Sequence, residues 1–183
     1  MKIKFIIIII LFTSGFNLYS QHSEKLIELT QNLKPIDSIV KIKKFRNGKI
    51  KEISKSLVYE YGEYNYKILS GKQQLFHKTG QLFFEQSYDN LGNLLYQKQI
   101  NESGETYKII ETNRIDLKKD ILIEELLSSN KNIIIESFEK EFNRAEKNGK
   151  LKLWKEGKRK NGKKTGKWKI YNLCDKTFKI KKY

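Results

Sequence analysis

The sequence is poor in residues that can cross-link a chain. Cys174 is the only cysteine among 183 residues, so no disulfide can form within the chain. A protein of this kind depends on packing and backbone hydrogen bonds for its stability. Cys174 can still pair two chains or remain a free thiol, and we favour the free thiol.

Patterns typical of catalysis or metal binding are also scarce. His22 and His77 are the only histidines, and neither has a second metal ligand at a typical spacing. No serine lies in the Gly-x-Ser-x-Gly pattern of a hydrolase nucleophile. Glu139 and Glu141 would share one face of a strand, where a glycosidase pair is conceivable. We favour the simpler interpretation and expect no catalytic residue, no metal, no cofactor and no enzyme activity.

The chain begins with a pattern typical of a secretory signal peptide. Lys2 and Lys4 precede an apolar run of eight residues, Phe5–Phe12, and small and polar residues follow up to Ser20. A membrane-spanning helix needs about 20 apolar residues, so this run is too short to span. We therefore expect cleavage near Ser20–Gln21, export to the periplasm or beyond, and no transmembrane segment in the mature chain.

Acidic residues are scarce in the C-terminal quarter of the chain. From Lys140 to the end there are 17 Lys and Arg against 4 Asp and Glu, a net charge of +13. Residues 21–139 carry 18 against 17, a net charge of +1. The Debye length at physiological salt is about 8 Å, so this charge acts locally. It favours a polyanion or an anionic surface as partner.

Turn and helix patterns predict the start of the mature chain. Residues 23–34 fit a short helix that Ser23 caps and Pro35 ends. Asn47–Gly48 then lies between two alternating apolar runs, which is the strongest short pattern for a hairpin. We expect a type I′ turn there, with positive φ at both residues.

A glycine repeat predicts the middle of the chain. Gly80, Gly92 and Gly104 are spaced by twelve residues, and each precedes an apolar or aromatic cluster and a polar close. Such a period predicts short strands joined by tight turns. Strand alternation in residues 81–88 predicts one mainly apolar face and one mixed face.

The repeat is interrupted near residue 116. Residues 116–129 fit a helical period, with Asp116 as its N-cap. Residues 132–138 fit either a strand or a helix, and we favour a strand. From Asn148 onward the sequence again shows the pattern of short strands joined by tight turns.

The basic stretch 157–172 carries the sharpest chemical pattern. Gly157, Gly162 and Lys163 fit a phosphate-binding P-loop, but Lys164 lies where that motif requires a hydroxyl. The flanking sequence also lacks the strand and helix that a P-loop joins. We therefore set the P-loop aside.

Residues 162–171 instead resemble the bacterial variant of the MORN repeat, because Gly162, Gly166, Trp168 and Tyr171 follow its Gly-x-x-x-Gly-x-Trp-x-x-Tyr spacing. Residues 78–88, 90–100 and 148–157 look like degenerate copies. The resemblance implies an elongated sheet of antiparallel hairpins without catalytic residues, in which aromatic rings cover one face. Some bacterial members carry an antitoxin label, a role that does not fit an exported chain. The glycines expected at turns are Gly48, Gly80, Gly92, Gly104, Gly162 and Gly166.

The predicted fold class is therefore mainly β, an array of antiparallel β-hairpin repeats in an elongated sheet, with a short N-terminal helix and one helical insertion near 116–129. The expected segments are a signal peptide at 1–20, a helix at 21–35, hairpin repeats at 36–115, a helical or mixed insertion at 116–147 and a basic MORN-like hairpin at 148–183.

The function expected from these patterns is binding. We predict an exported binding or scaffolding module for an envelope component or a protein partner, with an anionic glycan or lipid surface as candidates. The alternative is a polyanion or nucleic-acid binder that stacks bases on Trp154, Trp168 and Tyr171, although export makes nucleic acid the weaker candidate. A purely solubilising role for the lysines is the other interpretation. The candidate ligand-binding patch contains Lys158, Arg159, Lys160, Lys163, Lys164, Lys167, Trp168 and Tyr171.

Overall fold

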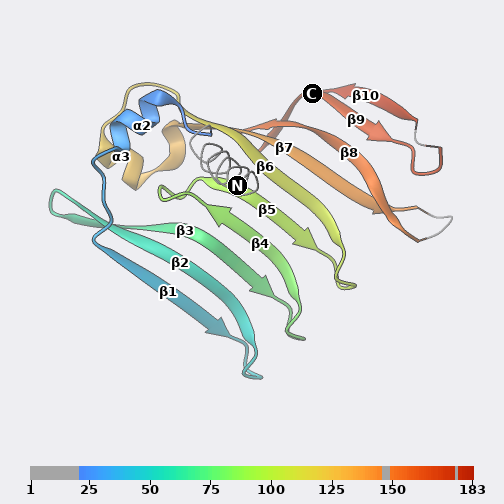
Figure 1. Ribbon diagram of the computed structural model, residues 1–183, viewed down its shortest axis with the longest axis horizontal. Helices are drawn as coiled ribbons and strands as arrows, with labels where there is room; N and C mark the ends of the chain where they lie inside the picture. Colours follow the sequence, from blue (N-terminus) through green and yellow to red (C-terminus); the bar gives the residue numbers. More distant parts are fainter. Residues whose placement is uncertain (1–20, 146–148, 176) are drawn as a thin grey trace, which may run out of the picture.

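The computed structural model describes residues 21–145, 149–175 and 177–183. They form one open antiparallel sheet of ten strands in which spatial order equals chain order (Figure 1). This confirms the predicted fold class; the proposed signal peptide at 1–20 lies outside the described residues. The strands are β1 (Asp37–Lys44), β2 (Ile50–Tyr61), β3 (Tyr64–Phe76), β4 (Leu82–Tyr88), β5 (Leu94–Ile100), β6 (Thr106–Leu117), β7 (Ile133–Arg144), β8 (Leu151–Lys160), β9 (Lys163–Tyr171) and β10 (Phe178–Lys182).

The predicted N-terminal helix is present but shorter than expected. Helix α2 (Glu24–Thr30) begins after Ser23, whose Oγ accepts a hydrogen bond from the Leu26 backbone N at 3.4 Å. Leu26 is fully buried, whereas Ile27, expected on the same apolar face, is 38 % exposed. A helix this short presents only one narrow stripe to the sheet.

The second helix starts later than predicted. Helix α3 (Ile123–Ser128) follows Leu122, which makes no side-chain cap hydrogen bond, and a 3₁₀ turn η1 (Asn130–Asn132) leads into β7. Asp116 is not a helix cap, because Asp116 and Leu117 continue β6 and pair with Ile134 and Ile133. Pairing with β7 satisfies their backbone groups, which outweighs a weak local helix preference.

Both helices pack on the same face of the sheet, at one end of the strands (Figure 1). We call this the helix face and the other side the open face. One cluster joins both helices to β6 and β7, and a second joins α3 to β2 and β3. Their buried members are Leu26, Leu91, Ile115, Leu126 and Ile133, and Leu57, Tyr59, Ile68 and Leu127. Among the described residues, only this end of the strands carries a second layer.

Four of the hairpins use the same five-residue turn, which explains the twelve-residue repeat. In Asp89–Asn93, the N of Asp89 donates to the O of Asn93 at 3.0 Å and the N of Gly92 donates to the O of Asp89 at 3.3 Å. The same pair of bonds closes turns 45–49, 77–81 and 101–105. The fourth residue is always glycine, with φ between 80° and 93°. One unit is a seven-residue strand plus this turn.

The predicted type I′ turn at Asn47–Gly48 is wrong, although the hairpin itself is present. Asn161 is the only non-glycine residue with positive φ in the described part of the chain, so Asn47 does not adopt the I′ conformation. That geometry occurs instead at Asn161–Gly162, where φ is 47° and 75° and the loop between β8 and β9 has only two residues. A longer loop needs positive φ at one residue, whereas a two-residue loop of this type needs it at both.

A β-bulge follows each five-residue turn. The residue three positions after the glycine is left out of the ladder: Lys51, Phe83, Leu95 and Tyr107 are skipped by the pairing. A bulge changes the direction of a side chain and increases the local twist. The expectation that rings line only one face is wrong, because rings such as Trp168 and Tyr171 lie on opposite faces.

Adjacent turns at the end of the sheet away from the helices also touch one another. Lys49 Nζ donates to the O of Thr79 at 2.7 Å, and Asn47 Nδ2 donates to the O of Lys78 at 3.2 Å. Further along, Arg144 Nη2 pairs with Glu105 Oε2 at 2.5 Å. At these two places, neighbouring hairpins are therefore joined through their turns as well as their strands.

The turn glycines offer a test that separates backbone strain from steric overlap. A Cβ on Gly48 would meet nothing within 4 Å, whereas a Cβ on Gly92 would lie 2.9 Å from Cγ2 of Ile68. We expect Gly48→Ala to lower the free energy of unfolding by about 1–2 kcal/mol, because an L-residue is strained at this φ. Gly92→Ala should cost clearly more in urea unfolding. Equal losses would contradict the close approach of this turn to β3.

Candidate functional site

The residues of the candidate patch lie on two strands, β8 and β9, near the edge of the sheet (Figure 1). A third strand that the sequence did not indicate, β10, completes this edge. Its signal was weak because Phe178–Lys182 has only two apolar residues among lysines. Strands β8, β9 and β10 form the basic end of the sheet.

Strand alternation divides the patch between the two faces. Arg159 pairs with Lys164 and Gly157 with Trp168, and this register places Arg159, Lys164 and Trp168 on the helix face. The other members lie on the open face: Lys158, Lys160, Lys163, Lys167 and Tyr171. The predicted single patch is therefore two separate groups.

Trp168 is buried and cannot stack on a ligand. It has no exposed surface, its Nε1 donates to the O of Lys158 at 3.0 Å, and its ring covers Gly157. Lys164 Nζ lies 4.4 Å from the centre of the ring, and Tyr183 meets it edge-on at 5.8 Å. Trp168 is a packing residue of the basic end, and the sequence could not show that glycine lies opposite it.

Gly166 is not a turn glycine, although its φ of 66° is positive. It lies inside β9, where the pairing steps from Gly157–Trp168 to Lys158–Thr165 and leaves a bulge. Its N donates to the O of Tyr183 at 3.1 Å, and the N of Tyr183 donates back at 3.0 Å. The bulge thus holds the last residue of the chain against β9.

Charged side chains form a compensated network on the helix face. Glu139 is fully buried, Lys108 Nζ lies 3.1 Å from its Oε2, and Arg159 also binds this oxygen. Glu141 on the same face pairs with Lys155 at 2.6 Å and with Lys108 at 3.5 Å. A buried carboxylate needs such partners. The network gives both carboxylates cationic partners, and Glu139 Oε1 has no hydrogen-bond partner among the described residues.

The pKa of Glu141 reflects this network. Burial alone would raise the pKa, but the side chains of Glu139, Lys155 and Lys108 more than offset it and hold the pKa below its ordinary value.

The open face of the basic end carries a surface of exposed lysines. We define the basic surface as Lys158, Lys160, Lys163, Lys167 and Lys182, all exposed. Lys160 lies 3.7 Å from Glu136 Oε1. In the described part of the chain the other four make no ion pair, and Lys158 lies beside Thr165 while Lys163 lies beside Lys160. Tyr171, on the same face, has its hydroxyl committed to Glu156 Oε1 at 2.7 Å.

A pocket of about 330 Å³ lies next to this surface. It forms where the pairing of β6 with β7 skips Asn113, and it extends across β7 to β8 and β9. Its lining includes Asn113, Glu136, Phe138, Lys158, Lys160 and Thr165. Sequence reasoning missed it, since a bulge in one strand and residues of three others combine only in the folded sheet.

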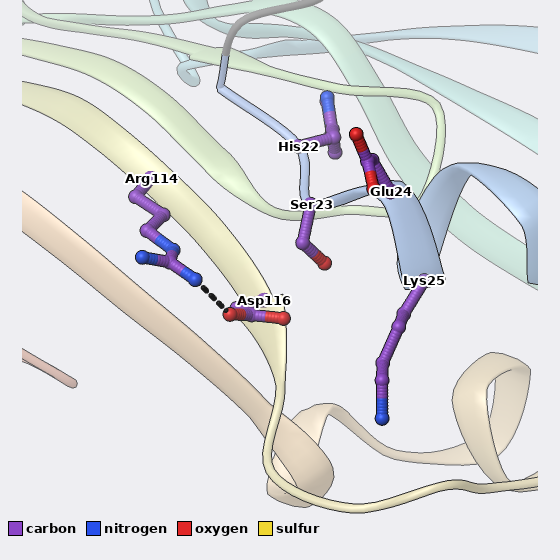
Figure 2. A pocket seen from close by; sticks show the side chains of 6 residues that line it. All are labelled: His22, Ser23, Glu24, Lys25, Arg114 and Asp116. Carbon is purple, nitrogen blue, oxygen red and sulfur yellow. Dashed lines mark hydrogen bonds and ion pairs between the residues drawn. The ribbon is translucent and has the colours of Figure 1, made fainter.

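A second, more open pocket of about 540 Å³ lies where the N-terminal segment meets β6 (Figure 2). Arg114 Nη2 contacts Asp116 Oδ2 at 2.6 Å, as the dashed line shows. Hydrogen bonding to Ser23, followed by that to Arg114, holds the pKa of Asp116 below its usual value. His22 Nε2 is bound to Asp89 Oδ2 at 2.7 Å. These groups bind one another and fix the N-terminal segment to the sheet.

Compared with protein-family models, curated proteins and solved structures, the chain shows no significant match. Among the described residues, no helix has the length and apolar character needed to cross a membrane. The MORN resemblance therefore stays a prediction that rests on residues 162–171.

The contact between Gly157 and Trp168 gives a direct test of the basic end. A Cβ on Gly157 would lie 2.4 Å from atoms of the Trp168 ring. We expect Gly157→Ala to lower the free energy of unfolding by about 1–3 kcal/mol through overpacking. It should also expose Trp168 to acrylamide quenching in a Trp154→Phe background. Combining it with Trp168→Leu should recover part of the loss, and strict additivity would contradict the contact.

The lowered pKa of Glu141 predicts how stability depends on pH. Its contribution is complete above the ordinary glutamate pKa of about 4.3 and is lost as the pH falls through the lower folded-state value. Glu141→Gln should therefore reduce stability at pH 7 and flatten the decline between about pH 5 and pH 2. Glu63→Gln, at an exposed turn residue, is the control. Parallel curves for Glu141→Gln and the native chain would refute the assignment.

Proposed function

We propose that the protein is a non-enzymatic, exported binding module whose basic surface binds a linear polyanion. The observation that carries the proposal is the basic surface itself. Five exposed lysines share one sheet face over three adjacent strands, and four of them have no acidic partner among the described residues.

The distribution of charge favours an extended ligand over a compact one. Adjacent strands lie about 4.8 Å apart and alternate residues about 6.8 Å apart, so the lysines form a two-dimensional array rather than a single focus. An array suits a polymer that carries one negative group after another. On the helix face, Lys108, Lys155 and Arg159 are already paired with Glu139 and Glu141. Lys164, Lys179 and Lys181 on that face make no ion pair with a described residue.

The arrangement favours a polyanion other than nucleic acid. Binding of single strands usually needs exposed rings on which successive bases stack. Trp168 is buried, and the Tyr171 hydroxyl is held by Glu156. Phe178, which is 51 % exposed, has its ring centre 5.6 Å from that of Tyr171, so nucleic acid is disfavoured by the expected export and by the burial of Trp168 rather than by a lack of rings. The likeness to MORN variants and the expected signal peptide support the same proposal of an exported binding protein.

Salt dependence tests the proposal. We expect the purified protein to bind inorganic polyphosphate and polygalacturonate, with an affinity that falls steeply as salt rises, because bound lysines displace counterions. The triple change Lys158→Ser, Lys163→Ser and Lys167→Ser should weaken both and reduce the slope of log affinity against log salt by about two to three.

The matched control removes three exposed lysines on strands β1 and β3, in the opposite half of the sheet: Lys41→Ser, Lys44→Ser and Lys67→Ser. It changes the net charge equally, so similar losses in both triple variants would show that only total charge matters. The proposed function would be refuted if neither polymer binds, or if the affinity does not change with salt.

A further inference from the structure

We infer that the pocket beside the basic surface is a subsite for one acidic sugar unit, so that the polyanion is an acidic polysaccharide. The inference rests on the proposed function and specifies its ligand class. The pocket has a volume of about 330 Å³, at the lower end of the range for small-molecule sites. This size suits a single ring.

The cross-strand register brings most of the pocket residues together on the open face, whereas Ser137 and Arg159, which also line the pocket, belong to a helix-face row. Phe138 pairs with Lys158, which in turn pairs with Thr165. Glu136 pairs with Lys160 in the next row. Asn113 projects from the bulge in β6, where the pairing passes directly from Thr112 to Arg114. The aromatic ring of Phe138 thus lies among the amide, hydroxyl, ammonium and carboxylate groups of the pocket.

Several of these polar groups are free to bind a ligand. The Asn113 amide, the Thr165 hydroxyl and the Lys158 ammonium make no hydrogen bond or ion pair with any described residue. Together they supply donors and acceptors for hydroxyl groups and one cation for a carboxylate or sulfate. A sugar acid presents this combination.

Phe138 supplies an apolar surface for the sugar ring. It is half-buried, so part of its ring is available within the pocket. The face of an aromatic ring carries partial negative charge, which attracts the polarised C–H groups on the face of a pyranose. Within the pocket it is the single aromatic residue, which fits one sugar unit better than a row of stacked bases.

Glu136 makes the pocket unsuitable for a densely charged polymer. Its carboxylate lies 3.7 Å from Lys160 Nζ and would repel a second negative group close to the first. A polysaccharide carries one charge per sugar with hydroxyl groups between, whereas polyphosphate carries a charge on every unit. The lysine array binds both polymers, but the pocket contributes to the polysaccharide alone.

Two substitutions separate this subsite from the basic surface. Phe138→Ala should lower the affinity for polygalacturonate about tenfold and leave inorganic polyphosphate within twofold of the native value. Thr165→Val, which keeps the shape of the side chain, should lower polygalacturonate binding severalfold without affecting polyphosphate. Phe142→Ala, on the same strand but outside the pocket, is the folding control and should change neither affinity by more than twofold.

The possible outcomes are distinguishable. If Phe138→Ala and Thr165→Val leave polygalacturonate binding unchanged while the triple lysine change weakens it, the subsite is refuted and the proposed function stands. Equal losses for both polymers, or an oligothymidylate whose binding also depends on Phe138, would overturn the acidic-sugar class. Should Phe138→Ala unfold, as circular dichroism would reveal, Thr165→Val alone decides. If no polymer binds the native protein, the proposed function fails and the subsite with it.

Discussion

Backbone pairing between neighbouring strands is the interaction on which this molecule depends. Helices α2 and α3 cover one end of one face, so in the described part of the chain most of the ten-stranded sheet is a single layer. Burial of apolar surface cannot hold such a layer as it holds a two-layer domain. The ladder hydrogen bonds, the cross-strand side-chain pairs and the repeated turns must supply the remainder.

The basic end shows how this constraint is met without a helix above it. A buried carboxylate, Glu139, joins β6 and β8 through Lys108 and Arg159, and a buried ring, Trp168, lies on Gly157. At the basic end these contacts take the place of the packing that α2 and α3 provide over β2, β3, β6 and β7. They also give Lys108 and Arg159 on the helix face a carboxylate partner.

Local patterns in the sequence were sufficient for the hairpins but not for the details of pairing. Glycine spacing gave the strands and turns, because positive φ is a requirement that one residue meets alone. Whether an Asn-Gly pair forms a type I′ turn depends on loop length. Asn47–Gly48 lies in a five-residue turn and does not form it, whereas Asn161–Gly162 is a two-residue loop and does. The prediction that a helix starts at Asp116 was wrong because this residue pairs with β7, a strand that lies later in the chain and that local patterns do not reveal.

Composition alone indicated the lysine-rich region, whereas the geometry of the strands divides its residues between the two faces of the sheet. A run of lysines indicates charge, but alternation sends Arg159 and Lys164 to one face and Lys158 and Lys160 to the other. The burial of Trp168 depends on a glycine eleven positions earlier, brought opposite by the hairpin and its bulge. The pocket depends on a skipped residue, Asn113, two strands away from the lysines. No window of sequence contains these relations.

The five-residue turn has a consequence for how such a chain can change in length. Each repeat contributes one strand, so adding or removing a single unit would reverse the direction of every strand that follows it. Turns that now adjoin one another would move to the opposite end, and contacts such as that between Lys49 and Thr79 could not continue. Growth or shortening in steps of two units preserves the arrangement. The number of strands between the helices and the basic end can therefore change only by an even number if the strands that follow are to keep their direction.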